Sequence, residues 1–308
     1  MGTLVLAIII LTVGSAHGSC GSDSWHIVPV ETGPVLDGIL HDACWTRAEP
    51  RIGFIQRDPN PGEASTEQTN MYAVYTDEAL YVAFECLDSD ADNIVARLRR
   101  RDSSVWSDDN VDIWFDPTGS GLQLYYFSTN PAGVKYDALN AMRGLSSNRQ
   151  WDAHWDVATR ITEHGWNAEF EIPFSNFKYE KGDDSSWWFN AGRVIRRKGE
   201  ETYVAPVAYE HNMFYLEDAV RLTGIKNIAS GVGLKFVPYS KSDYRSSEAK
   251  NGGTSDNTKV NAGADIDLDL GSTLTLATTF RPDFAEIDLD PNQYQIGIGD
   301  PANFSSKR

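Results

Sequence analysis

Residues 101–116, RDSSVWSDDNVDIWFD, place an aromatic ring among charged groups on the approach to a strand. Trp106 lies between Arg101 and the adjacent pair Asp108 and Asp109. A sugar offers an apolar C–H face that stacks on such a ring, and hydroxyls that charged side chains bind. The segment therefore indicates carbohydrate recognition, although a packed strand that follows a solvated acidic loop would also produce this pattern.

A second aromatic segment, WDAHWDV at 151–157, has related chemistry. Trp151 and Trp155 stand among aspartates in a loop-like stretch, so either ring could contact the same ligand. His154, which lies between them, is more typical of a surface histidine than of a metal ligand.

Several aspartates could supply oxygens to calcium, which takes six to eight such ligands from a flexible loop. Asp108 and Asp112 are the candidates beside Trp106, and the run that contains Asp88, Asp90 and Asp92 has the same composition. No EF-hand spacing accompanies either group, so solvated loop and strand-edge aspartates are the simpler interpretation.

Glu169 and Glu171 are the carboxylates whose spacing could support catalysis. As residues i and i+2 of a strand they lie about 7 Å apart, and a glycosidase needs two carboxylates about 5–10 Å apart across a cleft. A plain strand with outward-facing carboxylates has the same pattern. The sequence contains no nucleophile elbow, P-loop, dinucleotide fingerprint, CxxC or HExxH motif.

Composition excludes one class of partner and favours one class of fold. The net charge of −17 argues against nucleic acid, which is bound by clustered Lys and Arg. The basic run at 97–101 is flanked by acidic segments that can pair with it. Nine Trp, thirteen Tyr and thirteen Phe favour β-structure.

The elements that must position these residues are short strands separated by turns. Hairpins are predicted at 69–88, at 111–131 with a turn at Gly119–Gly121, and at 156–174, and further strands at 186–197 and 201–207. Two short helices are expected at 41–48 and 91–100, and Trp45, Trp114 and Trp166 are expected in the core. These patterns predict an all-β fold, an antiparallel β-sandwich of jelly-roll or immunoglobulin-like type.

The C-terminal part has a different pattern. An extended run at 231–246 and a polar loop at 246–259 precede an alternating strand at 260–271, with a tight turn at Gly271-Ser272. Such strands are typical of an outer-membrane β-barrel, although a soluble sheet fits equally well. Because two or three strands cannot close a barrel, we expect this region to be incomplete.

The N-terminus is typical of an export signal. Residues 4–13 form an apolar core too short to span a bilayer, and Ala16 and Gly18 suit cleavage before Ser19. His17 disfavours acylation of Cys20. In an exported protein Cys44 and Cys86 could form a disulfide, but free buried thiols are equally consistent with their apolar surroundings.

Five segments together resemble the family 9 carbohydrate-binding module. They are VLDGILHDACWTRAE (35–49), TDEALYVAFECLDSD (76–90), RDSSVWSDDNVDIWFDP (101–117), WDAHWDV (151–157) and GWNAEFEIPFSNF (165–177). RRKGEE (196–201), KFVPYS (235–240) and residues 275–291 resemble exported proteins that join such a module to an outer-membrane barrel region of unknown function. The resemblance implies a sandwich that binds sugar without catalysis, in some members with structural calcium.

The resemblance also implies a site in which two tryptophans clamp a terminal sugar and polar side chains hold its hydroxyls. Trp106 matches the first clamp position, and Arg101 and Asp109 are close enough in sequence to supply polar contacts. The second aromatic stays open among four residues: Trp151, Trp155, Trp188 and Tyr203.

We therefore expect a signal peptide at 1–18, a carbohydrate-binding sandwich at 19–225 and the start of a barrel region at 226–308. The expected function is carbohydrate binding, with carbohydrate and the outer membrane as partners and calcium as the one cofactor to consider. Two alternatives stay open: a glycoside hydrolase or an accessory part of one, and a periplasmic plug domain without a sugar ligand.

Overall fold

The structure is a computed structural model and describes residues 23–121, 123–177, 179, 185–207, 211, 213–216, 219–226, 228, 234–248, 254–269 and 275–280. The expected signal peptide, Cys20 and the turn at Gly271-Ser272 lie outside these residues. Within the described ranges no helix is long and apolar enough to cross a membrane.

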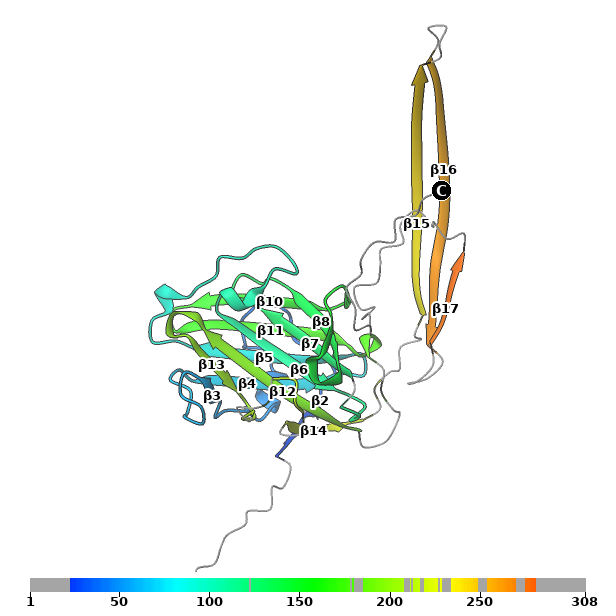
Figure 1. Ribbon diagram of the computed structural model, residues 1–308. Coiled ribbons are helices and arrows are strands. Elements are labelled where there is room, and N and C mark those ends of the chain that lie inside the picture. The colour runs from blue at the N-terminus through cyan, green and yellow to red at the C-terminus, as the bar shows by residue number, and fades with distance from the viewer. Residues whose placement is uncertain are drawn as a thin grey trace, which may run out of the picture.

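Two β-sheets pack face to face into a sandwich, as predicted (Figure 1). The larger sheet has the order β1-β14-β12-β6-β7-β8-β9, with β13 on β12 and β3 on β13. Its strands are β1 (Ser24–His26), β3 (Ile55–Asp58), β6 (Asn110–Asp116), β7 (Gln123–Thr129), β8 (Tyr136–Ala141), β9 (Ser146–Asn148), β12 (Ser185–Ile195), β13 (Glu200–Tyr203) and β14 (Val220–Ile225). The smaller sheet, of order β10-β11-β5-β4-β2, contains β2 (Val28–Pro29), β4 (Thr69–Tyr75), β5 (Ala79–Leu87), β10 (Asp156–Thr162) and β11 (Gly165–Pro173).

The predicted hairpins are confirmed. The pairs β4–β5, β6–β7 and β10–β11 are antiparallel, with turns where Gly and Asp residues favour them. The further strands expected at 186–197 and 201–207 are β12 and β13, and they also pair antiparallel. In the β6–β7 turn the buried Asp116 accepts hydrogen bonds from the amides of Thr118, Gly119 and Gly121 at 2.8, 3.1 and 2.7 Å. Gly119 and Gly121 have positive φ, a conformation that glycine adopts without steric cost.

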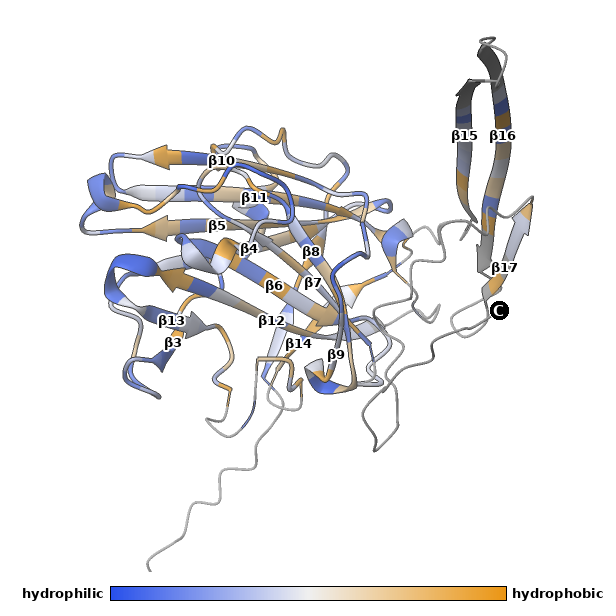
Figure 2. Ribbon diagram, turned by 45° about the horizontal axis from the view of Figure 1, so that its top comes forward, coloured by the Kyte–Doolittle hydropathy of each residue, from blue (hydrophilic) through white to orange (hydrophobic). Residues whose placement is uncertain are grey.

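Alternation along β6 gives each of its two faces a role (Figure 2). Val111, Ile113 and Phe115 point into the core between the sheets, where aromatic rings from both sheets meet. Trp114 points the other way into a second apolar cluster, which includes Val105, Leu124, Tyr126, Tyr136, Tyr203 and Leu216 and covers the outer face of the larger sheet. Trp45, Trp114 and Trp166 are buried as expected.

The helices expected at 41–48 and 91–100 are a wrong prediction. Each is one 3-10 turn, η1 (Trp45–Arg47) and η2 (Ala91–Asn93). In the second segment the amides of Val95, Arg97 and Leu98 donate to the carboxylates of Asp109 and Asp108, so they are not available for helical bonds. The remaining 3-10 turns are η3 (Val105–Ser107), η4 (Met142–Gly144), η5 (Phe174–Asn176) and η6 (Arg196–Lys198).

Both described cysteines are free and buried. Cys44 packs in a cluster under η1, and Cys86 lies in the main core, where burial raises the pKa of its thiol to about 12. The disulfide that the sequence left open does not form in this structure.

A third sheet follows the sandwich in sequence and has the order β15-β16-β17. It consists of β15 (Leu234–Glu248), β16 (Thr254–Asp269) and β17 (Thr275–Phe280), and Figure 1 shows the length of the first two. The polar stretch predicted as a loop at 246–259 is mostly strand, because β15 continues to Glu248 and β16 begins at Thr254.

Candidate functional site

A hollow of about 470 Å³ opens over the outer face of the larger sheet beside Trp106. We call it the Trp106 hollow. It lies where η3, the middle of β6, the end of β12, η6 and β13 come together. Its lining comprises Asp58, Pro59, Trp106, Asp112, Val194, Arg196, Gly199, Glu200, Glu201 and Met213.

Trp106 forms part of the wall. Its half-buried ring meets the ring of Tyr136 edge-to-face, with centroids 4.9 Å apart, and its Nε1 donates to the Tyr126 hydroxyl at 3.2 Å. These contacts fix the orientation of the indole, so the ring is rigid before any ligand arrives. A rigid aromatic surface at the edge of a hollow is what a stacked sugar ring requires.

Asp112 supplies a buried carboxylate to the hollow. The Tyr126 hydroxyl donates to its Oδ2 at 3.0 Å, which completes a relay from the Trp106 indole to the carboxylate. The other oxygen, Oδ1, is buried and has no hydrogen-bond partner among the described residues. An unpaired buried acceptor is costly, so this oxygen is prepared to receive a donor from a ligand.

Gly192 explains why this oxygen can lie so close to the sheet. Gly192 pairs with Asp112 across β12 and β6, and a Cβ at this position would lie 2.5 Å from Oδ1 and 2.9 Å from the Tyr203 ring. The glycine therefore leaves room for both side chains. The contact between Oδ1 and the Gly192 backbone is outside hydrogen-bond geometry.

Burial raises the pKa of Asp112 to about 7. The nearby charge of Glu201 contributes to this rise, while the Tyr126 hydroxyl and the Gly192 backbone oppose it. Asp112 thus changes its charge near neutral pH, an uncommon property for an aspartate.

Charged groups surround this carboxylate. Glu201 accepts a hydrogen bond from the Tyr203 hydroxyl, and Arg57 lies close enough to Tyr203 to lower its pKa, although burial raises that pKa overall. Nη1 of Arg57 is buried and has no partner among the described residues. Arg196 is exposed at the rim. The hollow therefore combines an aromatic wall with an acceptor, and an unpaired guanidinium donor lies nearby.

The two candidate calcium ligands have other roles. Asp108 accepts bonds from the amides of Arg97 and Leu98 and from the Asn130 side chain, each at 2.8 Å. Asp112 is engaged with Tyr126. No cluster of three His, Cys, Asp or Glu side chains suited to a metal occurs in the described part of the chain, and calcium binding by this pair stays a prediction.

Asp109 lies next to the hollow without lining it. Its Oδ2 accepts the amide of Val95 and its Oδ1 the amide of Arg196, at 2.7 Å for the latter. The side chain is 3% exposed, so it fastens two loops together and does not reach a ligand. This placement corrects its expected role as a sugar contact.

The other expected contacts lie away from the Trp106 hollow. Arg101 forms ion pairs with Asp137, at 2.8 Å, and with Asp152. Trp155 is buried in the core, stacks on Phe170 and donates to Asp137, so no face of its ring is available to a ligand. Arg101 and Trp155 therefore do not belong to the candidate site in this structure.

The remaining candidates for a second aromatic also lie outside the hollow. Trp151 packs on Tyr125 against the main core, and Trp188 lies under the Arg221 guanidinium, 3.3 Å from its ring centroid. Tyr203 is buried. Among the residues that line the hollow with Trp106, Met213 comes from a segment that carries no motif. Because side chains alternate along a strand, the sequence could have predicted that Asp112 lies on the outer face of β6. No signal in the sequence predicts that Met213 lines the hollow.

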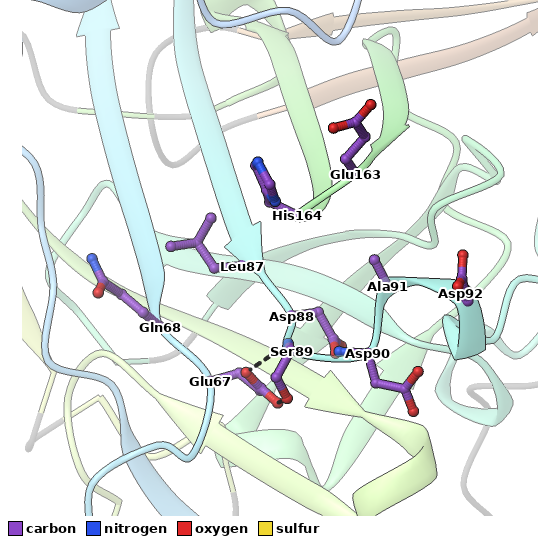
Figure 3. Close-up of a pocket in the computed structure, with 10 residues that line it drawn as sticks. All are labelled: Glu67, Gln68, Leu87, Asp88, Ser89, Asp90, Ala91, Asp92, Glu163 and His164. Atoms are coloured by element: carbon purple, nitrogen blue, oxygen red, sulfur yellow. Dashed lines mark hydrogen bonds between the residues drawn. The ribbon is translucent and has the colours of Figure 1, made fainter.

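A larger hollow, of about 720 Å³, has acidic side chains at half of its lining positions (Figure 3). Burial alone would raise the pKa of Glu67, but hydrogen bonds from Lys198, Ser89 and Arg197 lower it to about 2. Asp88 is likewise paired with Arg197. These carboxylates are neutralised by the protein itself, so we assign no ligand to this hollow.

The two carboxylates considered for catalysis serve the fold. Glu169 is fully buried in β11 and accepts bonds from the Trp45 indole at 2.9 Å and the Gly38 amide at 2.8 Å. Glu171 accepts a bond from the Tyr81 hydroxyl at 3.0 Å. Because Glu169 lies inside the protein, this pair cannot act together across an open cleft.

Comparison with solved structures finds similar folds. A crystal structure from Bacteroides uniformis ATCC 8492, provisionally described as a carbohydrate-binding protein, is 14% identical, covers 66% of this chain and 99% of its own, and has a TM-score of 0.54. Two structures of a family 9 carbohydrate-binding module from Caldicellulosiruptor kristjanssonii, with cellotriose and with glucose, are each 16% identical with a TM-score of 0.46. They cover 66% of this chain and 95% and 98% of their own.

Sequence comparison assigns the family. No curated protein matches the chain. The family model described as carbohydrate family 9 binding domain-like matches residues 36–189, which is half of the chain and includes Trp106 and Asp112. The motif resemblance is thereby confirmed over this range, and the chain belongs to the carbohydrate family 9 binding domain-like family.

Proposed function

We propose that the protein binds an oligo- or polysaccharide without catalysis and that one sugar unit occupies the Trp106 hollow. The sugar ring stacks on Trp106, and a hydroxyl donates to the free oxygen of Asp112. The observation that carries the proposal is this buried Oδ1, which has no partner among the described residues and lies beside a fixed aromatic ring. Membership in the family and the binding of cellotriose and glucose by the Caldicellulosiruptor modules support it.

Titration of the chain with xylo-, cello- and laminari-oligosaccharides tests the proposal, with tryptophan fluorescence and calorimetry as readouts. We expect one sugar class to produce saturable binding that Trp106→Ala weakens at least tenfold, because the main stacking surface is lost. Trp188→Ala is the matched control, since Trp188 is equally half-buried and does not line the hollow.

Absence of saturable binding by any of these sugars would contradict the proposal. Unchanged affinity in Trp106→Ala would move the site elsewhere. The hydrolase alternative is tested in the same samples, because a glycosidase releases new reducing ends over time. A plug domain without a sugar ligand would produce neither signal.

We further propose that the protein is exported and that its third sheet contacts the outer membrane. The register of β15, β16 and β17 supports this proposal because it sorts side chains by charge. All four charged side chains described in the sheet lie on one face: Lys241, Asp243, Lys259 and Asp265. Among the side chains that the structure describes in this sheet, the opposite face carries no charge and exposes Phe236, Tyr244, Val260, Leu276 and Phe280.

The dimensions of the uncharged face also support a lipid contact. From Phe236 to Tyr244 the strand rises about 27 Å, close to the apolar band of about 25 Å on outer-membrane barrels. On the charged face the Tyr239 ring packs over Gly263, where a Cβ would lie 2.3 Å from the ring. This pairing reinforces the register on the side that would face the interior of a barrel.

Flotation of the purified chain with phospholipid vesicles tests the membrane proposal. Val260→Asp, on the uncharged face, should reduce the bound fraction, because a charge facing lipid is costly. Asn261→Asp, the next residue on the charged face, should leave it unchanged. Equal effects of the two substitutions, or no flotation of the unaltered chain, would count against the proposal.

A further inference from the structure

A second hollow adjoins the Trp106 hollow. It encloses about 1000 Å³ and is lined by residues 90 and 92–97, Ser107, Arg196 and Arg197. Arg196 lines both hollows, and Ser107 directly follows Trp106, so the two adjoin along η3 and η6. We call the second one the arginine hollow.

Two buried aspartates hold the main chain of two arginines in this hollow. Asp108 accepts the amide of Arg97 at 2.8 Å, and Asp109 accepts the amide of Arg196 at 2.7 Å. Since both carboxylates are occupied by backbone donors, they fix the segments while the arginine side chains extend outward. Arg97 and Arg196 are exposed, and no ion pair joins either guanidinium to a carboxylate within the described part of the chain.

Arg197, the third arginine that lines this hollow, does form ion pairs with carboxylates. Arg197 forms ion pairs with Glu67 at 2.9 Å and with Asp88. At the other end of the hollow Asp90 accepts two hydrogen bonds from the Asn93 side chain, at 2.9 and 3.0 Å, and is engaged there. Arg97 and Arg196, from distant segments of the chain, thus line one hollow without an ion pair to any described carboxylate.

The chemistry of these two groups selects an anion. A guanidinium presents a planar fork of donors that matches a carboxylate bidentately, and charge-assisted bonds of this kind are about twice as strong as neutral ones. Because the overall charge repels anions and is screened beyond about 8 Å at physiological salt, selectivity must come from direct contact at this place.

We propose that the arginine hollow binds a uronate, an acidic sugar unit whose neighbour in the same oligosaccharide occupies the Trp106 hollow. This inference rests on the proposed function and narrows its substrate class from oligosaccharides in general to those that carry a carboxylate. Asp108 and Asp109 act as positioning residues for the arginines, so the double aspartate that follows Trp106 acquires a role in recognition.

The test compares a neutral gluco-oligosaccharide with the same oligomer oxidised at C6 to glucuronate, and a xylo-oligosaccharide with and without a glucuronate branch. Calorimetry on the 308-residue chain measures both affinities. We expect the acidic oligomer of at least one pair to bind about tenfold more tightly, a difference of about 1.4 kcal/mol. Arg97→Gln should abolish this preference and leave neutral binding unchanged, because Arg97 does not line the Trp106 hollow.

Arg196→Gln should also abolish the preference, whereas Arg100→Gln should not. Arg100 is an exposed arginine three residues from Arg97 and lies outside both linings, so it controls for net charge. Equal binding of the acidic and neutral oligomers would overturn the uronate assignment and leave sugar binding intact. A preference that survives both glutamine variants would also overturn it. Failure of every oligomer to bind would overturn the proposed function and this inference together.

Discussion

The carboxylate of Asp112 is the main hydrogen-bonding group that we assign to the candidate site. One oxygen is fixed by Tyr126, and the other is buried and has no partner in the part of the chain that the structure describes. Burial, with the neighbouring Glu201, holds the pKa of this carboxyl at about 7. A ligand hydroxyl that donates to the free oxygen stabilises the ionised form, so binding and ionisation are linked.

We therefore expect sugar affinity to rise about tenfold between pH 5.5 and 8, because the ionised fraction of a group with a pKa near 7 increases over this range. Calorimetric titration at several pH values measures the change. Asp112→Asn should bind weakly at every pH and show a flat profile. A wild-type profile as flat as that of the variant would exclude Asp112 as the acceptor.

The same pKa has a consequence for stability with a defined sign. The folded protein holds the Asp112 proton up to about pH 7, whereas an unfolded aspartate releases it near pH 4. The contribution of this group to the free energy of unfolding therefore falls as pH rises from about 4 to 7. Comparison of urea denaturation at pH 5 and 8 should show this fall, and Asp112→Asn should reduce it.

At the scale of elements, the site depends on how β6 and β12 lie side by side. Gly192 is the residue of β12 that pairs with Asp112, and the absence of its side chain allows the carboxylate and Tyr203 to approach the sheet. The loops beside the hollow depend on β6 as well, because Asp108 and Asp109, just before the strand, hold the segments at 95–98 and 196.

Gly192→Ala should displace Asp112 and weaken sugar binding at least tenfold. The added Cβ would lie 2.5 Å from Oδ1 and 2.9 Å from the Tyr203 ring, and we expect this overpacking to lower the free energy of unfolding by about 1–3 kcal/mol. Calorimetry measures the first effect and urea denaturation the second. Normal affinity in a destabilised variant would show that the position of Asp112 is not critical for binding.

At the scale of the whole molecule, Arg193 ties the two sheets together. It belongs to β12 of the larger sheet and is 1% exposed. Its guanidinium donates to the Gln68 carbonyl at 3.1 Å and the Thr69 hydroxyl at 3.0 Å, and to the Leu87 carbonyl at 2.8 Å, all at the ends of strands in the smaller sheet. Oδ2 of Asp88 lies 3.8 Å from Nη2 of Arg193, and its carboxylate balances the charge of the guanidinium.

Arg193→Met should lower the free energy of unfolding by about 3 kcal/mol, because it leaves the acceptors on Gln68, Thr69 and Leu87 without their donor and removes one of the two cations beside the buried Asp88. Urea denaturation followed by circular dichroism measures the change. Arg160→Met, at an exposed arginine of β10, should change stability by less than about 0.5 kcal/mol. Equal stability of the two variants would show that the sheets do not depend on this link.

The local sequence pattern alone was sufficient to predict the strands, the hairpins and the sandwich, because period-2 alternation and turn residues act between near neighbours in the chain. It also singled out Trp106, and the structure places this half-buried ring in the wall of the hollow. It was not sufficient for Arg101 and Trp155, whose partners Asp137 and Phe170 come from other strands. The local pattern also did not show that Asp108 and Asp109, just before β6, accept hydrogen bonds from backbone amides at 95–98 and so prevent a helix at 91–100.

By itself, then, the sequence determined the fold class, the family and the position of one aromatic ring beside a strand. Only the tertiary structure decided which side chains accompany that ring, since the pairing of β6, β12 and β13 brings Asp112 and Glu201 together and the packing of other segments adds Arg196 and Met213 to the same hollow. The physical reason is distance along the chain. Local propensities act between neighbours, whereas burial, an unpaired acceptor and a raised pKa exist only after distant segments have packed together.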